Sequence, residues 1–235
     1  MTRVAVPLPG ALSQNLLARS REFGNAFWSK TNCSITTGQE DPFGGTLGCK
    51  IVENAATATH SIGVIFSAIP QASVCFSIYV KAAERVSCVP DVFGRSPTVF
   101  APPALIGAAV DLSLGIVFTP TASFIQPGTK WLIGNTGLGA GWWRIAIWGS
   151  DARGSQRQVD LSLSSAPNVQ TYTGDGTSGL LVYGAQVSYS DGPIPYVDTT
   201  GTAVNTANVG AVRRLALSSR APATARIAAT GRTPA

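Results

Sequence analysis

The sequence VCFSIYVKAA, residues 74–83, alternates between two kinds of side chain. Phe76, Ile78 and Val80 are apolar and lie two residues apart, so they share one face of an extended strand. The other face carries Cys75, Ser77, Tyr79 and Lys81. This period of two predicts a half-buried β-strand with one side in a core and the other toward solvent.

Further short segments of this kind occur along the chain, separated by turn residues. They include residues 108–118, 142–148, 159–165 and 180–190. The 235-residue chain contains 25 Gly and 15 Pro, and only 12% of it is charged, which suits strands joined by tight turns better than long helices. Eight or more short strands predict an all-β fold, a jelly-roll β-sandwich.

We expect three parts in the chain. Residues 1–12 contain Pro7 and Pro9 and are expected to form an extended N-terminal arm. Residues 13–204 form the jelly-roll β-sandwich, and residues 205–235 form a basic C-terminal tail rich in Ala, Thr and Arg. Too few apolar side chains occur in that tail for it to fold alone.

The net charge of +5 is confined to the C-terminal tail. All twelve acidic residues lie at or before Asp198, where twelve of the seventeen basic residues balance them. The other five basic residues are Arg213, Arg214, Arg220, Arg226 and Arg232. We interpret these five as anchoring residues that pair with carboxylates of a partner surface, through charge-assisted hydrogen bonds. The alternative is a solvated extension. Nucleic acid is not an expected partner, because no aromatic residues lie between the arginines.

The four cysteines and the longest apolar region argue against a zinc site and a membrane span. Cys33, Cys49, Cys75 and Cys88 have no C-x-x-C spacing, and the chain has a single histidine. We expect buried thiols in a chain made in a reducing bacterial cytoplasm, with a Cys75–Cys88 bridge as the alternative. Residues 99–118 contain two prolines, two glycines and an aspartate, so no membrane association is expected.

Several phrases, in order, resemble a jelly-roll domain of bacteriophage virion proteins, which is similar in design to carbohydrate-binding modules. They lie between residues 15 and 204: LLARSREFGNAFWSK (16–30), DPFGGTLGCKIVEN (41–54) with THSI (59–62), FSIYVKAAE (76–84), VDLSLGIV (110–117), GAGWWRIAIW (139–148) and LLVYGAQVSYSDGPIPYVDTTGTAV (180–204). Ser188 stands where this domain usually has an acid, and Asp198 where it usually has a proline.

The resemblance implies a sandwich whose first and last segments meet, and a protein carried on a phage particle. From it we expect a virion structural protein, a capsid decoration or cement protein that its terminal arms anchor to the major capsid protein or another virion protein. A homo-oligomer is expected, with a trimer as one option. The alternatives are a glycan- or receptor-binding module of a head or tail fibre and, third, a carbohydrate-active enzyme, because one fold hosts many functions.

The segment WWRIAIW, residues 142–148, carries the candidate carbohydrate-binding residues. Alternation places Trp142, Arg144 and Trp148 on one face, with Ile145 and Ile147 on the core face. Two indole rings beside a planar guanidinium would suit a host surface glycan. The alternative is that this face is buried under a second sheet, a neighbouring subunit or the chain's own arms. The same two alternatives apply to Trp131.

No catalytic residues and no cofactor are predicted. The single histidine, His60, lies in an alternating strand, and we expect it near the surface rather than in a catalytic triad, since no nucleophile-elbow motif is present. Asp175, in the sequence TGDGTSG, is loosely similar to a cation-binding loop but lacks further spaced acids. No metal ligands are therefore assigned, although a structural calcium ion remains an alternative.

Overall fold

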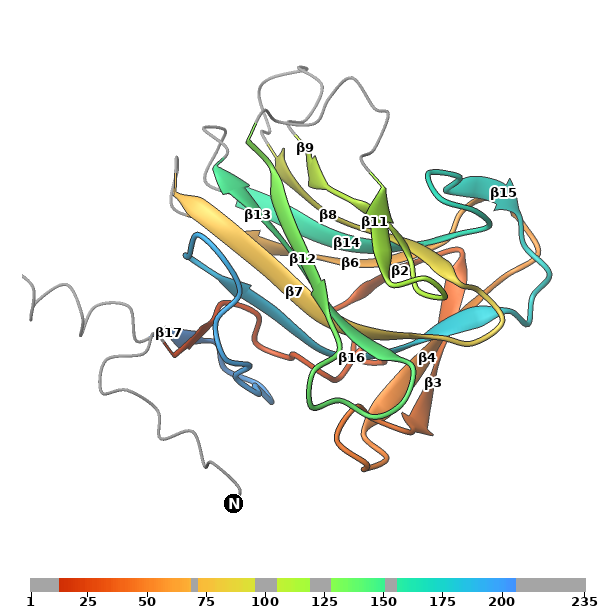
Figure 1. Ribbon diagram of the computed structural model, residues 1–235, viewed down its shortest axis with the longest axis horizontal. Helices are drawn as coiled ribbons and strands as arrows, with labels where there is room; N and C mark the ends of the chain where they lie inside the picture. Colours follow the sequence, from red (N-terminus) through yellow and green to blue (C-terminus); the bar gives the residue numbers. More distant parts are fainter. Residues whose placement is uncertain (1–12, 69–71, 96–104, 119–127, 151–155, 206–235) are drawn as a thin grey trace, which may run out of the picture.

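The computed structural model describes residues 13–68, 72–95, 105–118, 128–150 and 156–205. These residues form β-strands and turns without a helix, which confirms the predicted all-β fold (Figure 1). Among them no helix is long and apolar enough to cross a membrane. The arm over residues 1–12 and the five tail arginines lie outside the described residues.

One layer of the sandwich is a six-stranded antiparallel sheet. In spatial order its strands are β12 (Lys130–Gly134), β13 (Trp142–Ser150), β7 (Ser73–Ala82), β16 (Gly179–Ser188), β4 (Gly48–Glu53) and β3 (Cys33–Gln39). The three central pairs, β13–β7, β7–β16 and β16–β4, join distant parts of the chain, so the order is that of a jelly-roll-type sandwich rather than a meander of hairpins.

The second layer is a seven-stranded antiparallel sheet. Its strands are β11 (Ile116–Phe118), β10 (Ala109–Asp111), β8 (Ser87–Arg95), β14 (Gln156–Ser164), β6 (Ser61–Ser67) and β2 (Ser29–Thr31), with β9 (Leu105–Gly107) also paired to β8. A short two-stranded sheet of β5 (Thr57–Thr59) and β15 (Thr171–Thr173) lies at one end.

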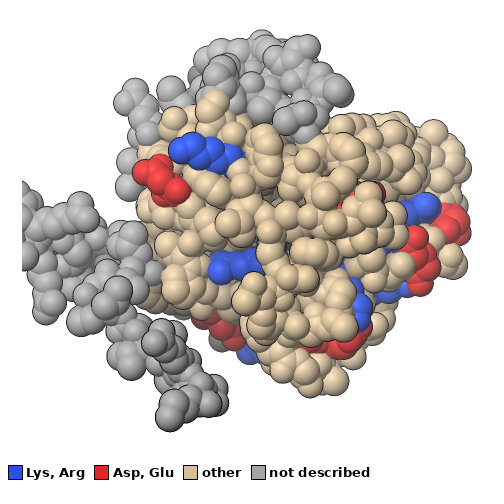
Figure 2. All heavy atoms as spheres, in the orientation of Figure 1, with Lys and Arg blue, Asp and Glu red and all other residues tan. Residues whose placement is uncertain are grey.

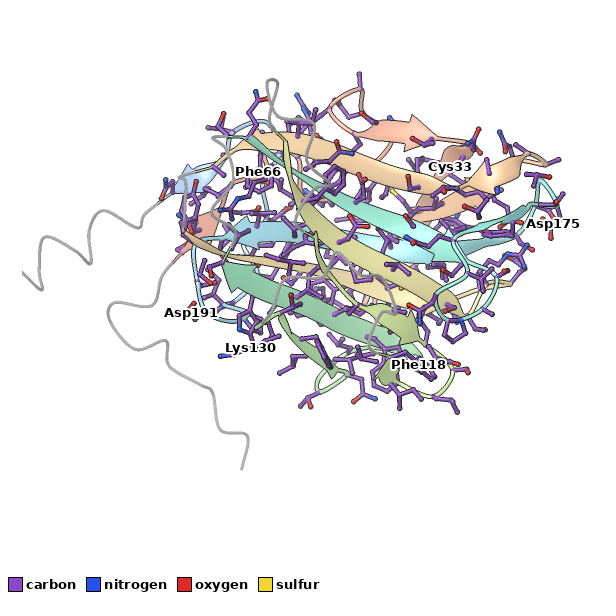
Figure 3. The ribbon with its side chains drawn as sticks, turned by 90° about the horizontal axis from the view of Figure 1, so that it is seen from above. Cys33, Phe66, Phe118, Lys130, Asp175 and Asp191 are labelled. Atoms are coloured by element: carbon purple, nitrogen blue, oxygen red, sulfur yellow. The ribbon has the colours of Figure 1, made fainter. Side chains whose placement is uncertain are left out.

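The core lies between the two sheets, and Figure 3 shows the layers with their side chains from above. The predicted inner residues of β7 and β13 are all there, including Phe76, Ile78 and Ile145. The second layer supplies Val92 and Leu161, among others. Each such side chain contributes about 1.5–3 kcal/mol when it leaves water, so the alternation of these strands fixes which face turns inward.

The prediction that β7 is half-buried is wrong, because both of its faces are covered. Its outward-facing residues Cys75, Ser77 and Tyr79 are as buried as those in the core. The cover is the chain segment after β16, residues 189–203, which we call the return segment. It crosses the outer face of the six-stranded sheet, where Tyr196 packs against Tyr79 at a ring-centroid distance of 5.7 Å.

The two ends of the sandwich meet, as the resemblance implied. β1 (Gln14–Asn15) pairs with β17 (Val204–Asn205) in a two-stranded sheet. A bulge in β16 receives the first segment: Gly184 has a φ of +57°, and the next residue, Ala185, donates its N–H to the carbonyl of Ser20 at 2.7 Å. A glycine suits this conformation, because other residues rarely adopt a positive φ.

Candidate functional site

The structure places Trp142, Arg144 and Trp148 on one face of the six-stranded sheet, as predicted. They lie opposite Lys81, Tyr79 and Cys75 of β7 in the strand register. That face points away from the core and toward the return segment. The three side chains therefore share a face, but the chain's own return segment covers part of it.

Trp142 is only 1% exposed, so its ring offers no open surface to a ligand in this structure. It forms a small second core with Tyr79, Leu181 and Tyr183, against which Tyr196 of the return segment packs. The indole N–H of Trp142 is buried and has no hydrogen-bond partner, and the same holds for the indole N–H of Trp148.

Arg144 holds the return segment to the sheet. Its Nη2 donates to the carbonyl of Ile194 at 2.7 Å, to Ser77 Oγ at 3.0 Å and to Gln186 Oε1 at 3.2 Å. The guanidinium also lies 5.5 Å from the ring centroid of Tyr79. With these contacts, Arg144 acts as a link between two parts of the chain rather than as an open sugar-binding group.

Trp131 lies elsewhere. It is 37% exposed on the edge strand β12, and its register partner is Ile147, so it belongs to the core-facing side of the sheet and not to the face of Trp142. Alternation along one strand could not reveal this difference, since it depends on how β12 pairs with β13.

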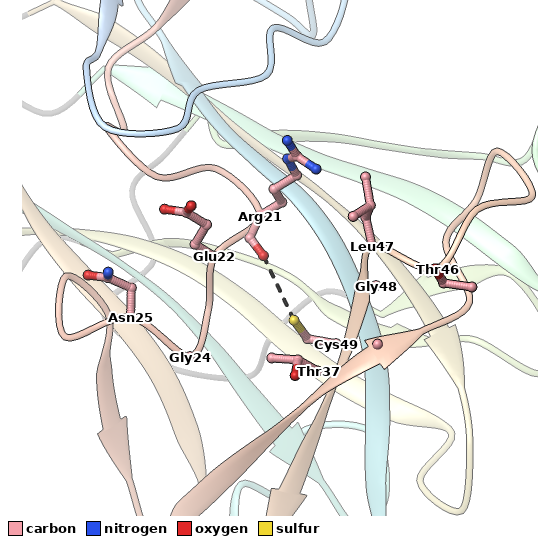
Figure 4. Close-up of a pocket in the computed structure, with 10 residues that line it drawn as sticks. Arg21, Glu22, Gly24, Asn25, Thr37, Thr46, Leu47, Gly48 and Cys49 are labelled. Atoms are coloured by element: carbon pink, nitrogen blue, oxygen red, sulfur yellow. Dashed lines mark hydrogen bonds between the residues drawn. The ribbon is translucent and has the colours of Figure 1, made fainter.

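An open cavity of about 590 Å³ lies beside β3 and β4. We call it the β3–β4 groove. Its lining residues come from three short segments: Arg21, Glu22, Gly24, Asn25, Thr37, Gly38, Thr46, Leu47, Gly48 and Cys49. Figure 4 shows Glu22 and Asn25 on one side of the groove and Leu47 on the other, with Arg21 between them.

Opposite charges hold the polar side chains of the groove in place. Arg21 Nε lies 3.0 Å from Asp198 of the return segment, and Glu22 pairs with Arg19. The thiol of Cys49 points at the carbonyl of Arg21, 3.8 Å away (Figure 4). The groove therefore presents a guanidinium, a carboxylate, an amide and two hydroxyls without an excess of either charge.

The loop over residues 41–47 forms one wall of the groove and is held by Asp41. Its carboxylate accepts hydrogen bonds from the backbone N–H groups of Phe43, Gly45 and Leu47. Burial alone would raise the pKa of Asp41, but these three N–H groups outweigh that effect and lower it. The loop presents Phe43, 58% exposed, whose ring edge packs on Tyr79 and Tyr183.

His60 is fully buried, so the expectation of a position near the surface is wrong. Its Nδ1 lies 2.8 Å from the carbonyl of Asn32, and its ring packs on Tyr172 of β15 at 4.9 Å. The pairing of β15 with β5 brings Tyr172 over the histidine, and this long-range contact leaves no local sequence signal.

The remaining sequence-based alternatives have structural outcomes. All four cysteines are free, so Cys75 and Cys88 are not bridged. The carboxylate of Asp175 already accepts hydrogen bonds from the backbone and hydroxyl groups of Thr177 and Ser178, which stabilise a turn. Within the described residues no group of three or more His, Cys, Asp or Glu side chains could hold a metal ion.

Charged side chains are sparse on the face shown in Figure 2, where blue and red atoms mostly lie side by side. The ion pairs of the described residues include Lys50–Glu84 and Lys81–Glu40. The described body thus has no concentrated basic surface on this face, in keeping with the balanced charge of its sequence.

The fold and the groove define a jelly-roll-type β-sandwich with a polar cavity at the edge of one sheet. No family model matches the chain, and no curated protein matches it. Among solved structures, it is similar to the enzymatically active domain of tailspike protein 4 of bacteriophage CBA120, with 12% identity and a TM-score of 0.48. The similarity covers 75% of this chain and 21% of that one, so the chain spans about a fifth of that domain.

Two carbohydrate-binding modules are also similar. TmCBM61, solved with β-1,4-galactotriose, shares 8% identity over 76% of this chain and 100% of its own, with a TM-score of 0.42. The xylan-binding domain CBM22-1 of Paenibacillus barcinonensis Xyn10C shares 14% identity with this chain. The similarity covers 77% of this chain and 96% of that domain, with a TM-score of 0.43. At these scores the likeness extends to the general arrangement of strands and not to the side chains of any site.

Proposed function

We propose that this chain is a glycan-binding β-sandwich module, with the β3–β4 groove as the sugar site. The observation that carries the proposal is the lining of the groove. A planar guanidinium, a carboxylate, an amide and two threonine hydroxyls surround an open cavity of about 590 Å³, beside the exposed apolar side chain of Leu47. Sugars present hydroxyl groups that both donate and accept hydrogen bonds, together with apolar ring faces, and this lining offers partners for each.

The charge of the groove favours a neutral glycan. Arg21 is paired with Asp198 and Glu22 with Arg19, so neither sign dominates. The Asp198 carboxylate also fixes the Arg21 side chain before a ligand arrives. Less side-chain conformational entropy is then lost when the ligand binds. An anionic sugar would meet the Glu22 carboxylate and bind less well.

Titrating the whole chain with neutral oligosaccharides tests this proposal. A glycan array first identifies the ligand, and calorimetry then compares wild type with Leu47→Ala, Thr37→Val and Arg21→Lys. We expect each change to weaken binding roughly three- to tenfold, because each removes one contact and a tenfold change equals about 1.4 kcal/mol.

A matched control is Leu114→Ala, which alters a side chain that is 65% exposed near the β11 edge of the other sheet. Its affinity should equal that of wild type. If the groove variants bind as well as the control, or if no neutral glycan binds, the groove is not the sugar site.

A second function, anchoring on a virion, is favoured by one further observation. Gln14 of β1 pairs with Asn205 of β17, so the first and last described parts of the chain lie side by side. Residues 1–12 and 205–235, joined to these neighbouring ends, would tie the module to one partner surface, such as a capsid or tail protein. The phage context of this proposal rests on the sequence resemblance.

Deleting residues 208–235 tests the anchoring function. The deletion removes all five tail arginines and leaves the β1–β17 pair in place. Incorporation into particles, measured by quantitative gel, should fall well below that of the full chain. Normal occupancy of the truncated chain would refute the anchor, while glycan binding should be unaffected by the deletion.

A further inference from the structure

One side of the sandwich carries an edge strand of each sheet. β12 ends the six-stranded sheet, β11 ends the seven-stranded sheet, and the two strands contact each other. Figure 1 shows both strands on the near side of the molecule, and in Figure 3 Lys130 of β12 and Phe118 of β11 lie along the same side. Within the described residues, neither strand has a pairing partner on its outer edge.

Large apolar side chains are exposed along this side, which we call the β11–β12 surface and define as residues 112–118 and 130–138. The exposed ones are Leu114, Ile116, Trp131 and Leu132. Proteins usually protect their edge strands from association with charged residues or prolines. β11 and β12 together contain one charged residue, Lys130, and no proline. Exposed apolar side chains gathered on unprotected edges indicate a surface that another molecule covers.

Two opposite charges lie at the two ends of the β11–β12 surface. Lys130 begins β12, whereas Asp111 lies at the β11 end, as the register partner of Ile116. None of the ion pairs within the described residues includes either charge. The Ser113 hydroxyl, at 2.6 Å, and the backbone N–H groups of Ser113 and Leu114 donate to Asp111 and lower its pKa, so the carboxylate is charged at neutral pH.

We propose that the β11–β12 surface is the contact between two copies of this chain, related by a two-fold axis. A two-fold axis through the middle of a surface brings each end of it to the opposite end of the other copy. Lys130 of each copy then meets Asp111 of the second copy, and the apolar side chains between them cover one another. The surface is therefore complementary to itself in charge as well as in polarity.

The size of the surface suits a weak dimer. An interface of about 1,000 Å² in total, near the lower limit for specific association, takes about 12–19 residues from each copy. Residues 112–118 and 130–138 supply sixteen. Trp131 is at the same time the residue type that most often dominates the affinity of such contacts.

This surface is separate from the β3–β4 groove, because β12 and β3 are the opposite edges of the six-stranded sheet. The proposal stands whether or not the groove binds a glycan. If the groove does bind one, a dimer carries two grooves and binds a repeating glycan more tightly than a single copy does. The homo-oligomer expected from the sequence would then be a dimer rather than a trimer.

The test is analytical ultracentrifugation of the full chain over a range of concentrations, with circular dichroism to show that each variant is folded. Ile116→Arg and Leu132→Arg each place a charge within the apolar part of the surface. Ile65→Arg is the matched control, because Ile65 is 43% exposed, against 42% for Ile116, and lies on β6, away from the β11 edge. Lys130→Glu tests the ion pair with Asp111 of the second copy.

Wild type and Ile65→Arg should form dimers with equal dissociation constants, in the range of about 1–100 µM for an interface of this size. Ile116→Arg and Leu132→Arg should raise the dissociation constant at least about tenfold, because each variant would bury an unpaired guanidinium in the contact. Lys130→Glu should raise it about three- to tenfold, since it places a carboxylate beside the carboxylate of Asp111.

Three results would overturn the proposal. One is a wild-type chain that stays monomeric at the highest concentration, as expected if a different protein covers the surface. Another is a dimer that Ile116→Arg and Leu132→Arg leave as strong as in wild type, as expected if the terminal segments make the contact. A dissociation constant for Lys130→Glu equal to that of wild type would overturn the two-fold arrangement.

Discussion

Glu53 shows how a single buried residue can organise its surroundings. Its carboxylate is fully buried and accepts hydrogen bonds from Arg85 Nε at 2.9 Å, from the Tyr172 hydroxyl at 2.6 Å and from the backbone N–H of Asp175 at 2.9 Å. Burial opposes the charged form, but Arg85 and the other donors outweigh it and hold the pKa of Glu53 below its ordinary value. The carboxylate thus joins β4 to the loop that follows β15.

We predict that Glu53→Gln lowers the free energy of unfolding by about 2–4 kcal/mol at pH 7, because Arg85 loses its charged partner. A carboxyl group with a lowered pKa in the folded state stabilises the fold above the unfolded-state pKa, and this stabilisation is lost as pH falls through the folded-state value. The difference between variant and wild type should therefore shrink below about pH 4.5.

Urea unfolding at pH 7 and at pH 3 measures this difference. The matched control is Glu40→Gln, whose carboxylate is exposed and pairs with Lys81 at the surface, so its cost should stay below about 1 kcal/mol. Equal costs for the two variants, or a Glu53→Gln cost that does not depend on pH, would show that the buried ion pair does not stabilise the fold in this way.

At the scale of elements, sequence alternation predicts strands and their inner faces well. Residues 142–148 form a strand with Ile145 and Ile147 in the core, as expected. The cover on the outer face could not be predicted, because the return segment around Ile194 and Tyr196 has two prolines and no periodicity. Its position depends on Arg144 and on contacts with residues nearly 180 positions away, such as Ser20.

The same reason explains why the β3–β4 groove was not predicted. Its residues come from a turn, the edge strand β3, and the loop that leads into β4. Two of these segments belong to phrases that carry the resemblance, but nothing in those phrases indicates that they meet around a cavity. The glycine-rich sequence DPFGGTLG, residues 41–48, with its two large apolar residues Phe43 and Leu47, is a signal that could have pointed there.

The contact between the first and last segments depends most on Asn15, which is fully buried. Its amide donates to the carbonyls of Ala185 at 3.1 Å and Val197 at 2.9 Å, and its Oδ1 accepts from Leu17 and Val187. We predict that Asn15→Ala lowers the free energy of unfolding by about 2–4 kcal/mol, because it leaves several buried backbone groups without partners.

Denaturant unfolding, with Asn135→Ala as the control at an exposed turn, checks this value. Hydrogen exchange adds a local measurement. Amides of β1, β17 and the return segment should exchange faster in Asn15→Ala than in wild type, and this increase should be larger than that of the amides of β7. A stability equal to that of the control would mean that Asn15 does not hold the ends of the sandwich together.

At the scale of the whole molecule, the described residues form a nearly neutral sandwich closed by its own ends. The outer face of the six-stranded sheet is covered by the return segment, whereas the β3–β4 groove is open. This contrast leads us to place sugar binding at the groove rather than on the face of Trp142, Arg144 and Trp148. The five tail arginines, outside the described residues, keep the anchoring function that we propose for them.

Mapping amide chemical shifts by NMR during titration with a neutral oligosaccharide tests the central claim most directly. We predict that the largest changes fall on residues 21–25, 37–38 and 46–49, with little change at Trp142 and Trp148. Changes centred on residues 142–148 and on the return segment would contradict this account and would mean that the return segment opens to admit the sugar. No change at saturating glycan would contradict the binding function itself.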